Sequence, residues 1–132
     1  MKQGSSGSTY KFQPRQIVYL EHETTRLYAE VIEVVAAREI CWVRPLMMAV
    51  SSLSHNGLPG DSLEQLVLYD LREGADLLWP ASLFQPALDT EVIPFLVRLG
   101  NPDEVQQTNN LDAHKQLSSF VQKVWHVYKS SF

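Results

Sequence analysis

The residues of this chain that could bind a metal ion are four histidines, at positions 22, 55, 114 and 126, and a single cysteine, Cys41. No two histidines have the i, i+4 spacing, and the chain lacks the Cys-x-x-Cys pair, with which proteins commonly bind zinc. His114 and His126 are twelve residues apart, which is too far for two side chains of one helix to share an ion. Surface histidine is therefore the better interpretation, and we expect neither a metal ion nor another cofactor.

The residues that could act in catalysis show no recognisable arrangement. Cys41 stands between Ile40 and Trp42, so a small buried hydrophobic side chain is a better interpretation than a nucleophile. Gly-x-Ser-x-Gly, Walker and dinucleotide-binding motifs are absent from the sequence. The acids of one short segment, Asp70, Glu73 and Asp76, lack the apolar surroundings that raise a carboxyl pKa, and we interpret them as a solvated turn. We therefore expect no enzymatic activity.

Length and composition are typical of one globular domain. The chain has 132 residues, of which 45% are hydrophobic and 20% are charged. Residues 3–9, QGSSGST, have the composition of a flexible segment. We expect a flexible lead over 1–9 and a single domain over 10–132. The lone cysteine excludes an internal disulfide and fits a reducing compartment.

Charge is unevenly distributed along the chain. Residues 51–110 hold two bases and nine acids, whereas residues 111–132 hold three lysines and one acid. An acidic middle segment is a poor nucleic-acid surface, although it permits a basic protein partner or a simple solvated face. Aromatic residues on the expected strands could form a base-stacking platform, but a core role is the stronger interpretation for them: Tyr19, Tyr28, Trp42, Tyr69 and Trp79. We expect no nucleic-acid binding.

Alternating apolar residues predict several β-strands. The expected strands cover residues 16–22, 26–35, 40–50, 63–71 and 77–79. Segments 26–35 and 40–50 form a long hairpin through a turn at 36–39. Pro45 donates no backbone hydrogen bond, so its strand is either an edge strand or bulged at that point. Trp79 is expected in the core.

Proline-rich and helical segments follow the strands. Residues 82–84 fit a short strand or a 3₁₀ turn, and a helix with a candidate cap at Asp89 ends near Gly100. A second helix, capped by Asp112, has an apolar stripe formed by Leu117, Phe120, Val121, Val124 and Tyr128. Segments 51–61 and 101–110 are expected to be loops, and no apolar run is long enough to span a membrane. The predicted fold class is α+β: a small, strongly bent antiparallel sheet or SH3-like barrel with C-terminal helices.

One face of the segment 40–50 is a candidate interface with another protein. Trp42, Arg44 and Met48 fall on the same side of an alternating strand. Tryptophan, arginine and methionine are enriched at the centres of protein interfaces. The alternative is that Trp42 is buried and that the Arg44 side chain only passes over it to reach water.

Two blocks of the sequence resemble a known family. "LYAEVIEVVAAREICWVRPLMM" (27–48) and "DLREGADLLWPASLFQPALDTEVIP" (70–94) are similar to the V-subunit family of the photosynthetic NDH complex of cyanobacteria and chloroplasts. The likeness covers residues 10 to about 128 and carries no metal-binding or catalytic motif. It implies a peripheral subunit on the cytoplasmic face of the thylakoid membrane, which binds other subunits and does not insert into the membrane. Such a subunit would help to stabilise the ferredoxin-docking region for electron flow to plastoquinone.

Two other classes of function remain open. The first is an assembly or regulatory adaptor of a photosynthetic complex, and the second is an enzyme or a nucleic-acid-binding protein. Ferredoxins are acidic, so the acidic segment 51–110 suits contact with neighbouring subunits better than direct contact with ferredoxin.

Overall fold

The computed structural model describes residues 12–51, 66–100 and 110–129. The flexible lead predicted over 1–9, most of the two predicted loops, His55 and the first residues of the predicted strand 63–71 lie outside these ranges.

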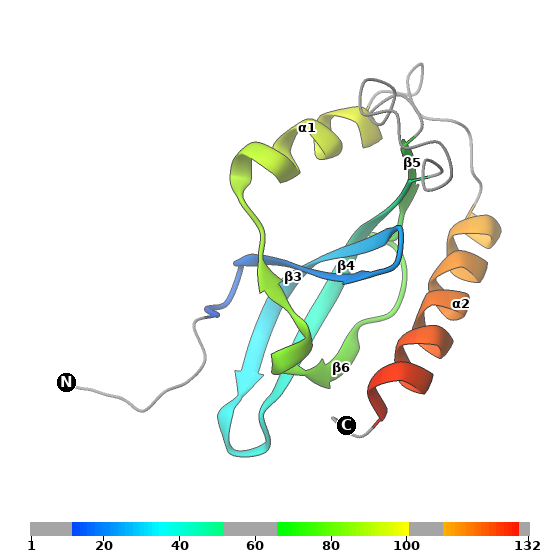
Figure 1. Cartoon of the computed structure of the whole chain (residues 1–132). Coiled ribbons are helices and arrows are strands. Elements are labelled where there is room, and N and C mark those ends of the chain that lie inside the picture. The colour runs from blue at the N-terminus through cyan, green and yellow to red at the C-terminus, as the bar shows by residue number, and fades with distance from the viewer. Residues whose placement is uncertain (1–11, 52–65, 101–109, 130–132) are drawn as a thin grey trace.

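Three long antiparallel strands form the centre of the fold (Figure 1): β2 (Ile17–His22), β3 (Thr25–Val35) and β4 (Ile40–Ser51). Their β-branched and aromatic residues favour the extended backbone. A 3₁₀ turn, η1 (Ala36–Arg38), joins β3 to β4, and Glu39 closes it in the left-handed conformation. The hairpin and turn predicted over 26–50 are confirmed.

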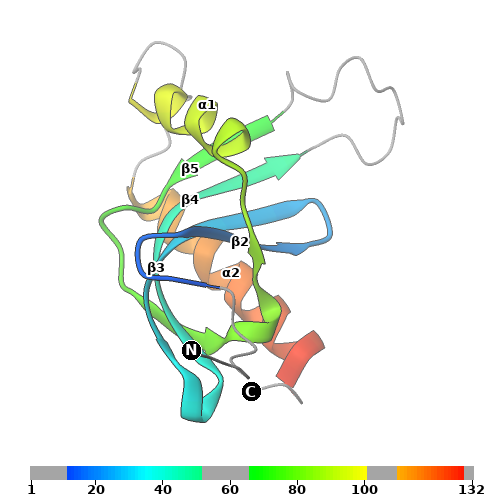
Figure 2. The ribbon, with the colours of Figure 1, turned by 90° about the vertical axis from the view of Figure 1, so that its left-hand side faces the viewer.

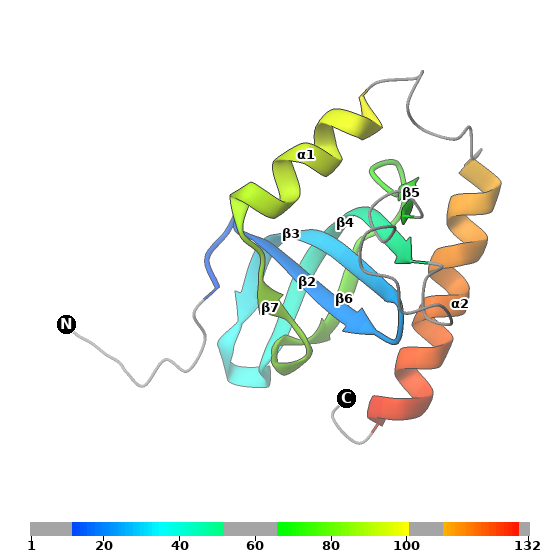
Figure 3. The ribbon, with the colours of Figure 1, turned by 45° about the horizontal axis from the view of Figure 1, so that its top comes forward.

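The free side of β4 is shared by two short strands. β5 (Leu66–Asp70) pairs with residues 47–51 of β4, and β6 (Leu77–Pro80) pairs with residues 40–43. The chain then passes through the 3₁₀ turn η3 (Ala81–Leu83), and β7 (Gln85–Pro86) pairs with β2 (Figure 3). The result is a six-stranded antiparallel sheet of order β5-β4-β3-β2-β7, with β6 beside β4. This open sheet is compatible with the predicted strongly bent sheet or SH3-like barrel.

Two helices complete the α+β fold. α1 (Asp89–Leu99) follows β7, and α2 (Asn110–Tyr128) is the last described element. Asp89 and Asp112 were expected to be the N-cap residues of the two helices, but each lies inside the first turn. The cap of α1 is Leu88, and α2 begins at Asn110. A carboxylate in the first turn is favourable beside the partial positive charge of the helix N-terminus. No helix in the described part of the chain is both long and apolar enough to cross a membrane.

The helices cover two separate core clusters on different sides of the sheet (Figure 2). Under α2, Phe120 and Val124 pack with Cys41 and Trp79, and Trp79 is only 6% exposed, as predicted. Under α1, Val92 packs with a smaller set of buried residues: Tyr28, Met47, Ala49 and Leu68.

Pro45 lies at a bulge, as the sequence allowed, and β4 is an internal strand. Met47 pairs with Tyr28 while Pro45 pairs with Ala29, so Leu46 is an extra residue in β4. An extra residue reverses the alternation of side chains beyond it. Met48 consequently enters the core cluster under α2 instead of continuing the face of Arg44.

Candidate docking surface

α1 covers only part of its face of the sheet. Glu30 lies two residues from Tyr28 on β3, so both side chains are on the α1 side, and Glu30 pairs with Arg44. Trp42, two residues before Arg44, pairs with Glu33 on one side and Leu78 on the other. The hairpin end of this face, which lies away from α1, therefore bears a tryptophan, an arginine and a leucine. We refer to Trp42, Arg44, Asp76 and Leu78 as the open face.

Asp76 links the two residues of β4 on this face. The indole Nε1–H of Trp42 donates to Oδ2 of Asp76 at 2.9 Å. The guanidinium of Arg44 donates from Nε to Oδ1 at 3.1 Å and from Nη2 to Oδ2 at 3.4 Å. One carboxylate thus holds an aromatic and a cationic side chain in a fixed arrangement.

The electrostatics of the open face follow from these contacts. The hydrogen bond from Arg44, followed by that from Trp42, lowers the pKa of the Asp76 carboxyl below its ordinary value. The same pairing raises the pKa of Arg44. Because half of the Arg44 side chain is exposed, the ion pair contributes little to stability. Its effect is to orient the arginine.

Leu78 provides the apolar part of the open face. It is 63% exposed, although it lies in a strand beside Trp42. An isolated exposed leucine is ordinary, but this one adjoins a tryptophan and an oriented arginine. The tryptophan and the arginine are residue types enriched at interface cores, and Leu78 adds exposed apolar area beside them.

Two of the three predicted interface residues lie together on this surface, and the third does not. Trp42 and Arg44 are joined by Asp76, whereas Met48 is fully buried. The expectation that Met48 shares their face was wrong, because the extra residue Leu46 reverses the alternation. Asp76 was interpreted as part of a solvated turn, and its role was missed. Neither Asp76 nor Leu78 can be assigned from sequence without the pairing of β6 with β4.

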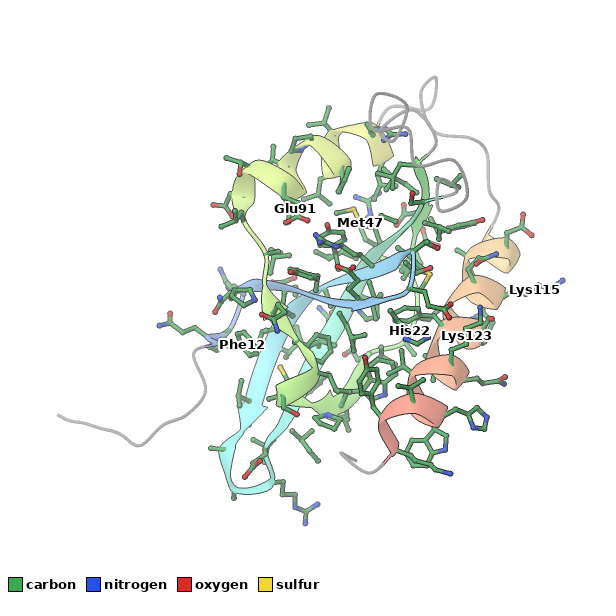
Figure 4. All side chains as sticks on the ribbon, in the orientation of Figure 1. Phe12, His22, Met47, Glu91, Lys115 and Lys123 are labelled. Atoms are coloured by element: carbon green, nitrogen blue, oxygen red, sulfur yellow. The ribbon has the colours of Figure 1, made fainter. Side chains whose placement is uncertain are left out.

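A second polar cluster connects α1 to the sheet through hydrogen bonds. Glu91 of α1 accepts hydrogen bonds from the guanidinium of Arg26 and the hydroxyl of Tyr28 through its Oε2 atom. Figure 4 shows Glu91 pointing from α1 toward the sheet. Arg26 also pairs with Glu21 at 2.8 Å, and its guanidinium carbon lies 4.4 Å from the centre of the Tyr19 ring. Burial and the bond to Glu91 raise the pKa of Tyr28. This cluster is structural, since its donors and acceptors satisfy one another.

The histidines and Cys41 form no reactive site in the described ranges. His22 packs edge-on against Phe120 and Tyr128, while His114 and His126 are exposed on α2. Burial raises the pKa of the Cys41 thiol to about 11, which keeps it protonated at neutral pH. No group of three or more histidine, cysteine, aspartate or glutamate residues among those described could hold a metal ion.

A cavity of about 390 Å³ lies between the turn after β5 and the start of α2. Among its described lining residues, Asp70, Glu73 and His114 are titratable. Asp70 is already held by Arg72, whose Nη2 lies 2.7 Å from its Oδ2, and this pairing lowers the pKa of Asp70. The described lining of the cavity therefore contains no set of convergent groups that would define a ligand.

Comparison of the chain with protein-family models, with curated proteins and with solved structures finds no match. The open face must therefore be interpreted from its own chemistry.

Proposed function

We propose that the protein is a non-catalytic accessory subunit of the photosynthetic NDH complex, bound on the cytoplasmic face of the thylakoid membrane. In this role it helps to stabilise the ferredoxin-docking region of the complex for electron flow to plastoquinone. The open face is its contact with a neighbouring subunit.

The observation that carries the docking part of this proposal is the shared carboxylate of Asp76. It holds Trp42 and Arg44 beside the exposed Leu78 before any partner binds. Side chains that are already ordered lose less conformational entropy on association than free ones do. Tryptophan and arginine are also the residues most enriched among those that dominate binding energy.

The two family-like blocks each contribute part of the open face. Block 27–48 supplies Trp42 and Arg44, and block 70–94 supplies Asp76 and Leu78. The two stretches that resemble the V-subunit family therefore meet at the open face.

Charge indicates which kind of subunit this face would accept. Glu30 and Glu33 of β3 border its apolar centre, and the only cation of the open face, Arg44, is paired with Asp76. An apolar patch with a basic rim would complement it, whereas an acidic surface would be repelled by the two glutamates.

Affinity purification tests the assignment. A tagged copy expressed in a cyanobacterium should retain subunits of the NDH complex from mildly solubilised thylakoid membranes, as identified by mass spectrometry. Retention of a different photosynthetic complex, or of assembly intermediates alone, would instead support the adaptor function. Retention of neither would contradict both.

A further inference from the structure

The outward face of α2 differs in charge from the rest of the molecule. Residues 113–129 contain three lysines and no acid, after Asp112 in the first turn of α2, whereas the described residues before α2 hold six bases and ten acids. α2 packs on the sheet through Ala113, Phe120 and Val124, so the side chains on its opposite side are directed to solvent. The helix thus forms a basic ridge on an acidic protein.

Lys115 and Lys129 form no salt bridge with another described residue. The salt bridges between described residues use Arg26, Arg44, Arg72 and His22, and none uses a lysine of α2. Figure 4 shows Lys115 pointing away from the sheet. A cation without an internal partner remains available to an external anion.

The ridge also contains a large aromatic side chain. Trp125 is 47% exposed, and Lys129 follows it by one helical turn. Lys115, Gln122 and Lys129 lie along the same side of the helix and span about 21 Å at the rise of an α-helix. A lysine one turn from an exposed tryptophan combines long-range attraction with an apolar contact.

We propose that this ridge, comprising Lys115, Gln122, Trp125, His126 and Lys129, binds an acidic surface of a partner protein. The partner differs from the one that fits the open face, which is bordered by glutamates. Because the described residues before α2 carry a net negative charge, an acidic partner is attracted to the ridge more than to the rest of the described surface, and this orients its approach. The inference rests on the charge of α2 and does not depend on the assignment to the NDH complex.

Two other anionic partners fit the ridge less well. An amphipathic helix binds membranes through its apolar face, and that face of α2 is buried against the sheet. Strong binding to nucleic acid depends on many phosphate contacts, whereas the ridge offers two lysines on a chain of net charge −4.

The test uses the full-length protein labelled with ¹⁵N and a defined acidic probe. The probe is an amphipathic peptide whose only charged residues are Glu and Asp and which also carries Leu and Phe. The same peptide with Gln and Asn replacing the acids is the neutral control. We expect the acidic peptide to shift the resonances of Lys115, Gln122, Trp125 and Lys129, and raising the salt from about 0.05 to 0.3 M to weaken binding at least about tenfold.

Two double variants that lower the net charge by the same amount distinguish binding at the ridge from a general effect of net charge. K115Q/K129Q should weaken binding at least about tenfold, whereas R38Q/K123Q, which removes one cation of η1 and the α2 lysine that is not part of the ridge, should leave it within about twofold. Arg38 lies in η1, and Lys123 borders the turn beside Glu23. Thermal melts of both variants identify any loss of folding.

The possible outcomes are distinct. Equal weakening by both double variants, shifts confined to other elements, or no binding of the acidic peptide would overturn the proposal. Binding to phosphatidylcholine vesicles containing phosphatidylserine, but not to the peptide, would assign the ridge to a membrane surface and would also overturn it. If the acidic peptide binds the ridge but the protein is not retained on the NDH complex, only the proposed function is contradicted.

Discussion

The indole N–H of Trp42 donates a hydrogen bond to the carboxylate of Asp76, a residue 34 positions further along the chain. This bond joins the start of β4 to the residue that precedes β6. It sets the position of Arg44 as well, because the same carboxylate accepts from the guanidinium. The order of the open face therefore depends on one acid.

Replacing Asp76 with alanine should release both of its partners. We expect the Trp42 indole N–H to exchange with solvent at least about tenfold faster, since its acceptor is lost. Global stability should fall by about 1 kcal/mol or less, because half of the Arg44 side chain is exposed and water screens its ion pair with Asp76. Nuclear magnetic resonance can follow the indole signal, assigned with Trp42→Phe. Asp70→Ala, which breaks a similar exposed pair with Arg72, is the control and should leave this signal unchanged.

The contribution of Asp76 to the unfolding free energy should decrease as the pH falls. Its pKa is lower in the folded protein than in the unfolded chain, so its stabilising contribution is complete above about pH 4 and is lost as the pH falls through the folded-state value. The difference in unfolding free energy between wild type and Asp76→Asn should therefore shrink between pH 6 and pH 3. Denaturant titrations at several pH values measure it, and a constant difference would show that the contact is not electrostatic.

Trp79 and Leu78 are neighbours in β6 with opposite environments. Trp79 is 6% exposed and lies in the core under α2, so Trp79→Ala should cost about 3–5 kcal/mol of unfolding free energy. Leu78 is 63% exposed, and Leu78→Ala should cost less than about 1 kcal/mol. Urea titrations of the two variants test whether Trp79 faces the core and Leu78 faces solvent. A cost below about 1 kcal/mol for Trp79→Ala would contradict it.

Glu91 should control the attachment of α1. Glu91→Ala leaves the hydroxyl of Tyr28 and the guanidinium of Arg26 without this acceptor, at a cost of about 1–3 kcal/mol. Amide hydrogen exchange should accelerate in α1 and remain unchanged in α2. Asp89→Ala removes another acid from the first turn of α1 and serves as the control. Equal exchange in both variants would mean that apolar packing alone holds the helix.

Local patterns in the sequence were sufficient for the element types. Alternation predicted the central strands, the proline after Trp79 marked the end of β6, and the 3.6-residue period predicted α2. Local patterns did not predict the first residue of either helix, because an aspartate such as Asp89 or Asp112 is favourable both at the cap and in the first turn.

The composition of the candidate site was less accessible from the sequence. Pro45 indicated a bulge or an edge, but whether an extra residue is present depends on the pairing with β3, which local sequence does not determine. That extra residue, Leu46, moved Met48 from the expected interface into the core. Asp76 joined the site through the pairing of β6 with β4, a contact between distant segments.

The most direct measurement compares two exposed apolar residues of equal accessibility. Leu78 on the open face and Val97 on α1 are each 63% exposed. We expect Leu78→Thr and Val97→Thr to melt like the wild type, because surface substitutions change stability by about 0.5 kcal/mol or less. On the solubilised NDH complex, tagged Leu78→Thr should bind at least about fivefold more weakly than the wild type, whereas Val97→Thr should bind normally. Retention of Leu78→Thr equal to that of the wild type, with matched melts, would contradict docking through the open face.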